Sequence, residues 1–224
     1  MIRPIPLIAT GGTMPTTEST TVRTKACDTR VRILEVARRL FITRGVDAVS
    51  YGDIAKEVGS TRANLHYHFG NKAELVKEVF ADTFEDVRKK LESIWLKPGL
   101  SLEERIDLLF EDAQERFHEF NQAGEQKTPW SLSSRARFDF SSVDTEVMAG
   151  IGEMSRYFEE CVTHGVQLAI GAGEYRSDMP VKDVVLMITP LWYFGSPITQ
   201  VSGIKRLKNH YAATKRMIKA AYGA

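Results

Sequence analysis

The sequence predicts an all-α protein, with a three-helix helix-turn-helix domain over residues 24–72 and a C-terminal helical bundle over residues 73–224. Three observations predict this class. Apolar residues recur at three- and four-residue spacing through most of the chain. No stretch alternates apolar and polar residues as a half-buried strand would. Two short helical segments, separated by a glycine turn, lie in the first third of the sequence.

Composition narrows the class of protein. A chain of 224 residues with 43% hydrophobic content is large enough to bury a core without disulfide bonds. Cys27 and Cys161 are too few for a disulfide framework or a zinc knuckle, which favours a reducing cytoplasm. No apolar run approaches the roughly 18 residues that a membrane span needs. We therefore expect a cytoplasmic protein with no membrane partner.

The N-terminal segment has a different composition. Residues 1–23 hold only a short apolar patch, which Pro4 and Pro6 interrupt, and the sequence predicts a disordered arm there. Because the segment before Met14 lacks any helical pattern, translation from Met14 is an alternative to translation from Met1.

Charge is distributed unevenly along the chain. Residues 23–80 carry 11 Lys and Arg against 7 Asp and Glu, an excess of four positive charges, whereas the whole chain has a net charge of +1. Residues 1–22 are balanced, so residues 81–224 carry a net charge of −3. This asymmetry favours contact between the front of the chain and a polyanion.

The front of the chain has clear helix boundaries. The first helix has Asp28 or Thr29 as its expected N-cap and ends at Gly45. In the second helix, Ser50 is the expected N-cap, with Asp53 completing a capping box, and Gly59 ends the helix. Ser60 or Thr61 begins a third helix, which ends at Gly70, and Asn71 begins a long fourth helix that ends before Pro98.

Behind the fourth helix, the sequence predicts helices over residues 101–120, 142–173, 180–197 and 203–222, with a less regular piece over residues 130–140. Pro190 removes a backbone donor and is expected to bend its helix near the middle. The last two helices present apolar faces late in the chain, which is typical of a dimer contact.

The second and third helices have the form of a helix-turn-helix. In such a motif the second helix lies in the major groove of DNA and the first braces it. A helix of that kind is short, polar on its outer face, and rich in hydrogen-bond donors near its N-terminus. The segment that follows Gly59 fits this description at Thr61, Arg62, Asn64, His66 and Tyr67.

The segment VSYGDIAKEVGSTRANLHYHFGNKAELVKEVF resembles the DNA-binding region of the TetR family of bacterial transcriptional regulators, and the resemblance covers residues 28 to about 80. The positions that match the family pattern are Ile54, Ala55, Gly59, Leu65, Tyr67, Phe69, Lys72 and Leu75. The resemblance implies an all-helical homodimer that binds a double-stranded DNA operator and a small-molecule effector. It also implies base contacts by Thr61, Arg62 and Asn64, and phosphate contacts by Tyr67, Lys72 and Ser50.

One position departs from the family pattern. The family usually has tyrosine directly after the leucine, where this chain has His66, so an imidazole would make that contact. We expect His66 and Tyr67 on the DNA side as donors, and His68 turned into the domain to hold the turn before Phe69. Residues two apart on a helix do not face each other, so His66 and His68 are not expected to hold a metal ion.

Aromatic residues gather in the rear half of the chain. Most are expected in the core, but an apolar pocket between bundle helices is a common small-molecule site. The residues that we expect to line such a pocket, with an apolar or aromatic effector, are Phe117, His118, Trp130, Arg135, Phe138, Phe158 and Trp192.

The preferred prediction is a ligand-responsive repressor that leaves a pseudo-palindromic operator when its effector binds; activation is not distinguished from repression. No nucleophile and carboxylate stand at a useful spacing around the histidines, so we expect neither enzyme activity nor a cofactor. An all-helical enzyme or small-molecule carrier without sequence-specific DNA binding remains the alternative. A non-specific architectural DNA binder fits less well, because the rear half is acidic and aromatic.

Overall fold

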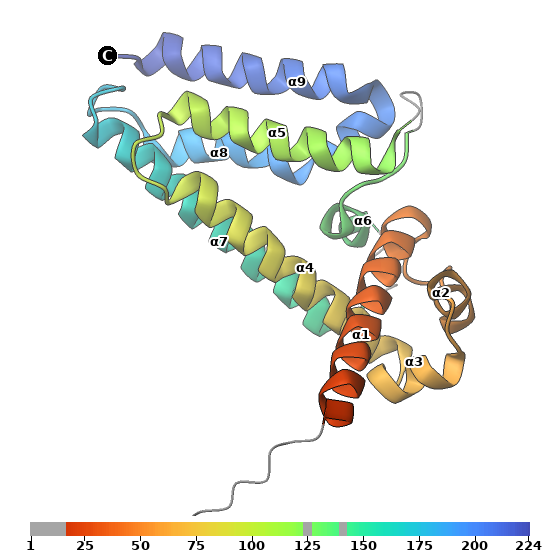
Figure 1. Cartoon of the computed structure of the whole chain (residues 1–224). Coiled ribbons are helices and arrows are strands. Elements are labelled where there is room, and N and C mark those ends of the chain that lie inside the picture. Colours follow the sequence, from red (N-terminus) through yellow and green to blue (C-terminus); the bar gives the residue numbers. More distant parts are fainter. Residues whose placement is uncertain (1–16, 123–126, 139–142) are drawn as a thin grey trace, which may run out of the picture.

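A computed structural model describes residues 17–122, 127–138 and 143–224. Within these ranges the chain is helical, without a strand of any length, and a single isolated bridge joins Tyr175 to Gly223. The all-α prediction is thereby confirmed (Figure 1). The helices are α1 (Thr17–Arg44), α2 (Tyr51–Val58), α3 (Arg62–Phe69), α4 (Lys72–Trp95), α5 (Leu102–Phe120), α6 (Leu132–Phe138), α7 (Thr145–Gly171), α8 (Val181–Tyr193) and α9 (Gly195–Tyr222).

The first helix is longer than predicted. It begins at Thr17 rather than at Asp28 or Thr29, so residues 17–23, which the sequence assigned to a disordered arm, belong to α1. Sequence periodicity marks the part of a helix that packs on a core, and the segment TESTTVRTKAC contains no large apolar stripe to reveal it. Met14 lies outside the described residues, so the question of the start codon is untested.

The head, which comprises α1, α2 and α3, is delimited by local capping contacts that the sequence predicted. Ser50 and Asp53 form the capping box of α2, and Gly59 ends the helix in the left-handed conformation at φ 71°. Thr61 caps α3 and Asn71 caps α4, each with a side-chain oxygen that accepts from a backbone N–H three residues on. These four boundaries are confirmed.

The core of the head extends beyond its own helices. Leu65 and Phe69 of α3 are buried against α1 and α2, together with residues from the first half of α4. Leu132 and Ala136 of α6 join the same apolar cluster, as does the start of α7. The head therefore packs on the bundle (α4 to α9) through α4, α6 and α7, and the domain boundary predicted at residue 72 runs through a shared core.

The bundle has two layers of helices. In Figure 1, α4 and α7 run side by side as a long diagonal pair, and α5, α8 and α9 lie across their far end. Arg105 of α5 is buried inside this assembly, with 0% of its surface exposed. Its guanidinium donates to the carbonyl oxygens of Ile94, Trp95 and Lys97 at 2.6, 3.0 and 2.7 Å, and so satisfies the end of α4.

The bend predicted at Pro190 is displaced. The structure ends α8 at Tyr193, so Pro190 lies in the last turn rather than near the middle, and the chain turns by 77° into α9. The predicted final helix over residues 203–222 is confirmed as the part of α9 that follows Gly203, and a further helical part from Gly195 precedes it. Gly203, at φ 73° and ψ 172°, interrupts the helical backbone of α9. The helical spacing of apolar residues that predicts the final helix begins at this glycine.

The piece predicted as irregular contains α6, which lies between the head and the bend of the bundle. Its Ser134 hydroxyl donates to the carbonyl of Tyr193, and the indole N–H of Trp130 donates to Thr199 at 2.8 Å. At its other side, Arg135 donates to the carbonyl of Arg44 at 3.4 Å. The α6 segment thus contacts the last turns of both α1 and α8.

The described helices differ from membrane-spanning helices in length or in composition. None is by itself both long enough and apolar enough to cross a bilayer; α8 and α9 meet the length and composition test only as a pair, with the 77° bend between them.

Candidate nucleic-acid interface

The third helix has one anchored side and one open side. Leu65 is fully buried and Phe69 nearly so, and together they fix α3 to the head. Because successive helical residues are about 100° apart, Ala63 and Tyr67 lie opposite this anchor. Tyr67 is 83% exposed, which makes it the most exposed of the large apolar side chains in the described ranges. The helix thus exposes Arg62, His66 and Tyr67, which the sequence predicted on its outer face.

At the start of α3, two predicted base-contacting residues also serve the helix itself. The Thr61 hydroxyl oxygen accepts from the Asn64 backbone N–H at 3.2 Å. The Asn64 side-chain amide donates to the Ser60 hydroxyl at 2.9 Å. Each residue keeps further hydrogen-bonding capacity, since a hydroxyl can donate while it accepts and an amide also has an oxygen.

Arg62 is folded back along the motif. A Cβ atom on Gly52 would lie 2.5 Å from Arg62 Nη2 and 2.9 Å from its Nε, so the guanidinium covers this glycine of α2. No ion pair involves Arg62 among the described residues. The lack of a side chain at position 52 leaves room for the arginine while its charge stays exposed to solvent.

The role of holding the turn, which we predicted for His68, belongs to His66. His66 Nδ1 lies 2.6 Å from the carbonyl oxygen of Gly70, so His66, not His68, holds the turn at the end of α3. The His66 ring also packs edge-on against Tyr51 of α2, with centroids 4.7 Å apart. His68 is half-buried, and its ring meets those of its neighbours Tyr67 and Phe69. His66 nevertheless remains exposed beside the outer face.

The remaining predicted contacts lie at the two ends of the motif. The Ser50 hydroxyl donates to the Asp53 carboxylate at 2.5 Å, so this hydroxyl is already engaged and has a negative charge beside it. The hydrogen bond from the Ser50 side chain holds the pKa of the Asp53 carboxyl below its usual value. Lys72, the first residue of α4, is half-buried and lines a small hollow with Asp47 and Asp144.

The predicted effector-binding residues do not line one cavity. Phe117 and Phe158 are buried in the bundle core, where the rings of Phe158 and Trp192 pack with centroids 4.9 Å apart. His118 is exposed on α5. Arg135 and Phe138 line a hollow of about 360 Å³ between α6 and the start of α9. Trp130, also buried, lines a different hollow.

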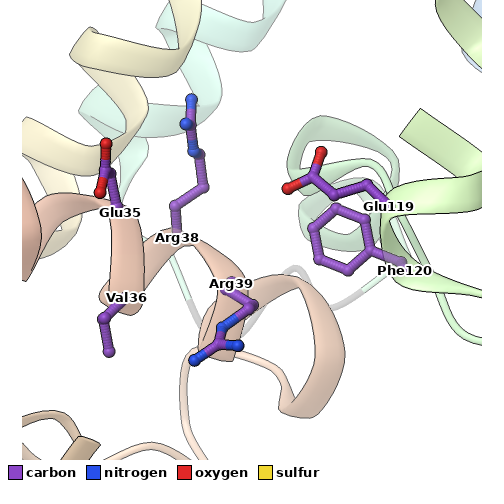
Figure 2. A pocket seen from close by; sticks show the side chains of 6 residues that line it. All are labelled: Glu35, Val36, Arg38, Arg39, Glu119 and Phe120. Carbon is purple, nitrogen blue, oxygen red and sulfur yellow. The ribbon is translucent and has the colours of Figure 1, made fainter. Parts of the chain in front are cut away.

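That second hollow belongs to a cleft between the head and the bundle, which the sequence did not predict. Figure 2 shows its outer part, of about 310 Å³, where Arg38 of α1 faces Glu119 and Phe120 of α5. The same three residues line an inner part of about 200 Å³, which reaches Trp130 and Leu132. No sequence signal could have found this cleft, because it brings together residues of α1, α4, α5 and α6 that lie far apart in the chain.

The charges around the cleft are only partly matched. Arg38 pairs with Asp86 at 3.0 Å, and Arg39 pairs with Glu57 at 2.7 Å. Glu35 and Glu119 face the cleft without an ion-pair partner in the part of the chain that the structure describes. In the same part of the chain, no three His, Cys, Asp or Glu side chains are grouped so that they could hold a metal ion.

Comparisons with known proteins agree with this geometry. Residues 33–79 match the family model described as bacterial regulatory proteins of the tetR family. The HTH-type transcriptional regulator AcrR of Shigella flexneri is 45% identical over 56 residues, which cover 25% of this chain and 26% of AcrR. TtgR of Pseudomonas putida, also named an HTH-type transcriptional regulator, is 45% identical over 65 residues, which cover 28% of this chain and 31% of TtgR.

The match to these curated relatives spans about a quarter to a third of their length. The fold is shared much further. A TetR family transcriptional regulator from Agrobacterium tumefaciens superposes with a TM-score of 0.73 at 16% identity, over 89% of this chain and all of that one. The head of this chain thus matches the model of the tetR family of bacterial regulatory proteins, and the chain shares its fold from head to bundle with a solved TetR family regulator.

Proposed function

We propose that this chain is a DNA-binding transcriptional regulator that recognises its operator with α3. The observation that carries the proposal is the division of α3 into a fully anchored side, at Leu65 and Phe69, and an outward side with Tyr67 83% exposed. A helix fixed in this way can enter the major groove without losing its own packing. The regulators AcrR and TtgR are similar to this chain in the same segment, which supports the proposal.

The proposed regulator acts as a homodimer, with α8 and α9 at the subunit contact. Large apolar side chains remain exposed along these helices, including Leu186 and Met217, at 66% and 61%. An exposed apolar face of this kind on a helical bundle is typical of a subunit contact. A two-fold dimer requires a pseudo-palindromic operator with half-sites about 34 to 36 Å apart.

A regulator of this kind works in the cytoplasm, without a membrane partner and without enzyme activity.

A small-molecule effector is proposed to act at the cleft between α1 and α5. A ligand held there would contact the head through Arg38 and the bundle through Glu119, and so could shift the head relative to the bundle. The lining favours an amphipathic effector, with an apolar body against Phe120, over the purely apolar one expected from sequence. A structure from Saccharomonospora viridis, similar in fold with a TM-score of 0.69, contains choline, which makes organic cations a reasonable first class to screen.

Repression is the proposed direction of control. KstR2 of Rhodococcus jostii, named a transcriptional repressor, is 25% identical over 155 residues, which cover 68% of this chain and 71% of KstR2. A dimer that covers a promoter blocks transcription until effector binding changes the spacing of its two heads.

Selection of bound sequences from random DNA tests the proposal. The expected result is an enriched pseudo-palindrome, whose affinity for the protein falls steeply as salt rises, because phosphate contacts release counterions. Recovery of unenriched DNA at every round would refute sequence-specific recognition.

A further inference from the structure

We propose that His66 recognises an exocyclic amino group of adenine or cytosine, because its contact with Gly70 through Nδ1 leaves Nε2 of the neutral ring as a hydrogen-bond acceptor. This inference rests on the proposed function, since it assigns a base contact within the operator. It also reverses the sequence expectation, which treated His66 as a donor.

The contact with Gly70 fixes the tautomer of the imidazole. His66 Nδ1 lies 2.6 Å from the Gly70 carbonyl oxygen, and a carbonyl oxygen can only accept a hydrogen bond. Nδ1 must therefore carry the proton and donate. In the neutral imidazole only one nitrogen is protonated, so Nε2 is left with a lone pair.

Two contacts keep the ring in this orientation. The bond to Gly70 holds one nitrogen, and the edge-on contact with Tyr51 supports the ring at a centroid distance of 4.7 Å. Tyr51 is itself buried in the core of the head, so it gives His66 a rigid backing. Around the axis of α3, His66 lies between the side that contacts Tyr51 and the outward side at Tyr67. His66 is an exposed residue, so a ligand can approach its side chain.

The chemistry of DNA restricts what such an acceptor can bind. Phosphate oxygens, guanine N7 and O6, adenine N7 and thymine O4 are all acceptors, and a neutral Nε2 repels each of them. The donors that the major groove offers are the N6 amino group of adenine and the N4 amino group of cytosine. A tyrosine hydroxyl at this position could donate to phosphate, whereas His66 in this tautomer cannot.

The other side chains of α3 complement this role. Arg62 is a pure donor and suits guanine, while the hydroxyl groups of Thr61 and Tyr67 can donate to bases or phosphates. His66 would therefore add discrimination at one base pair of each half-site, where it favours an amino group.

The experiment uses the operator selected with the wild-type protein. The selection is repeated with His66→Ala, and with His68→Ala as the matched control on the same helix. We expect the His66→Ala consensus to lose its preference for adenine or cytosine at one position per half-site, and the His68→Ala consensus to keep it. Circular dichroism and thermal unfolding of all three proteins verify that the head remains folded.

A second measurement removes the amino group itself. When the base at that position is replaced by an analogue without its exocyclic amine, wild-type affinity should fall about tenfold, in line with the cost of a lost base contact. The affinity of His66→Ala should not change, because that variant has no acceptor there.

The outcomes separate the two proposals. If the wild-type protein and His66→Ala enrich the same consensus with the same sensitivity to the amine, the protein is a sequence-specific binder and the role of His66 is overturned. If His66→Ala instead weakens binding to all sequences equally, the residue is a phosphate or structural contact, which also overturns it. Failure of the wild-type protein to enrich any sequence would remove the proposed function and this inference with it.

Discussion

An arginine lies at the outer face of α3 and another at the buried end of α4, and the two have opposite surroundings. Arg62 lies at the surface over Gly52, without an ion-pair partner among the described residues. Arg105 is fully buried, and its terminal nitrogens donate to three backbone carbonyls at the end of α4. Burial lowers the pKa of the Arg105 guanidinium, while the nearby carboxylates of Glu174 and Glu104 act in the opposite direction.

The difference shows that an arginine is available to an external ligand only when the fold leaves its donors unused. Arg62 can bind DNA because the head does not need its charge. Arg105 cannot, because removal of its guanidinium would leave buried carbonyl oxygens without donors. Changes at the two sites should therefore separate stability from DNA binding.

The largest effect is expected at Arg105. Arg105→Ala should lower the free energy of unfolding by about 3 kcal/mol or more, because charged hydrogen bonds to buried carbonyls are lost together. Arg156→Ala, which changes an exposed arginine on α7, should stay within about 0.5 kcal/mol of wild type. Urea denaturation of both variants measures this. Equal stability of the two variants would show that Arg105 does not hold the end of α4.

A pair of glycines on α7 tests the packing around the same arginine. A Cβ atom on Gly165 would lie 2.6 Å from Trp95 and 3.1 Å from Arg105, so Gly165→Ala should destabilise the bundle by about 1 to 3 kcal/mol. A Cβ atom on Gly152 would meet nothing closer than 3.9 Å, so Gly152→Ala should stabilise α7 by about 0.5 to 1 kcal/mol. Thermal unfolding of the two variants should give shifts of opposite sign; shifts of the same sign would contradict this packing.

On the outer face, Arg62→Ala should weaken operator binding by about 1 to 3 kcal/mol and relax the choice of sequence, with no loss of stability. Lys72→Ala should instead weaken binding to every sequence and reduce the salt slope by about one. Fluorescence anisotropy at several salt concentrations distinguishes the two. Equal losses of both variants on operator and random DNA would overturn this division of roles.

The smallest effect is expected in the capping box of α2. In the folded protein, the hydrogen bond from Ser50 holds the pKa of the Asp53 carboxyl below the unfolded value of 3.8. The carboxylate therefore stabilises the head above pH 3.8, and this contribution is lost as the pH falls through the lower folded pKa. Asp53→Asn should flatten the acid limb of the stability profile, measured by circular dichroism from pH 2 to pH 6. An unchanged acid limb would assign the pH dependence to other carboxyls.

The sequence predicted the head better than the bundle, and the reason is the range of the interactions. The caps at Ser50, Thr61 and Asn71 act over three residues, so their signals are contiguous in the sequence. The contacts of Arg105 with α4, and the cleft between α1 and α5, join segments that periodicity cannot relate.

The same limit applies within the interface. The motif identified which residues of α3 face outward, because helical spacing is regular. It assigned the turn to His68 instead of His66, because that choice depends on the positions of Gly70 and Tyr51. The helix itself could thus be predicted from the sequence, whereas the roles of its surface side chains depend on the three-dimensional positions of their neighbours.

Methylation interference on the selected operator measures whether α3 lies in the major groove. Methylation of guanine N7 adds a group in the major groove and should block the donors of α3. We expect two patches of interference, one in each half-site and about one helical turn apart. Binding that tolerates N7 methylation throughout the operator would contradict it.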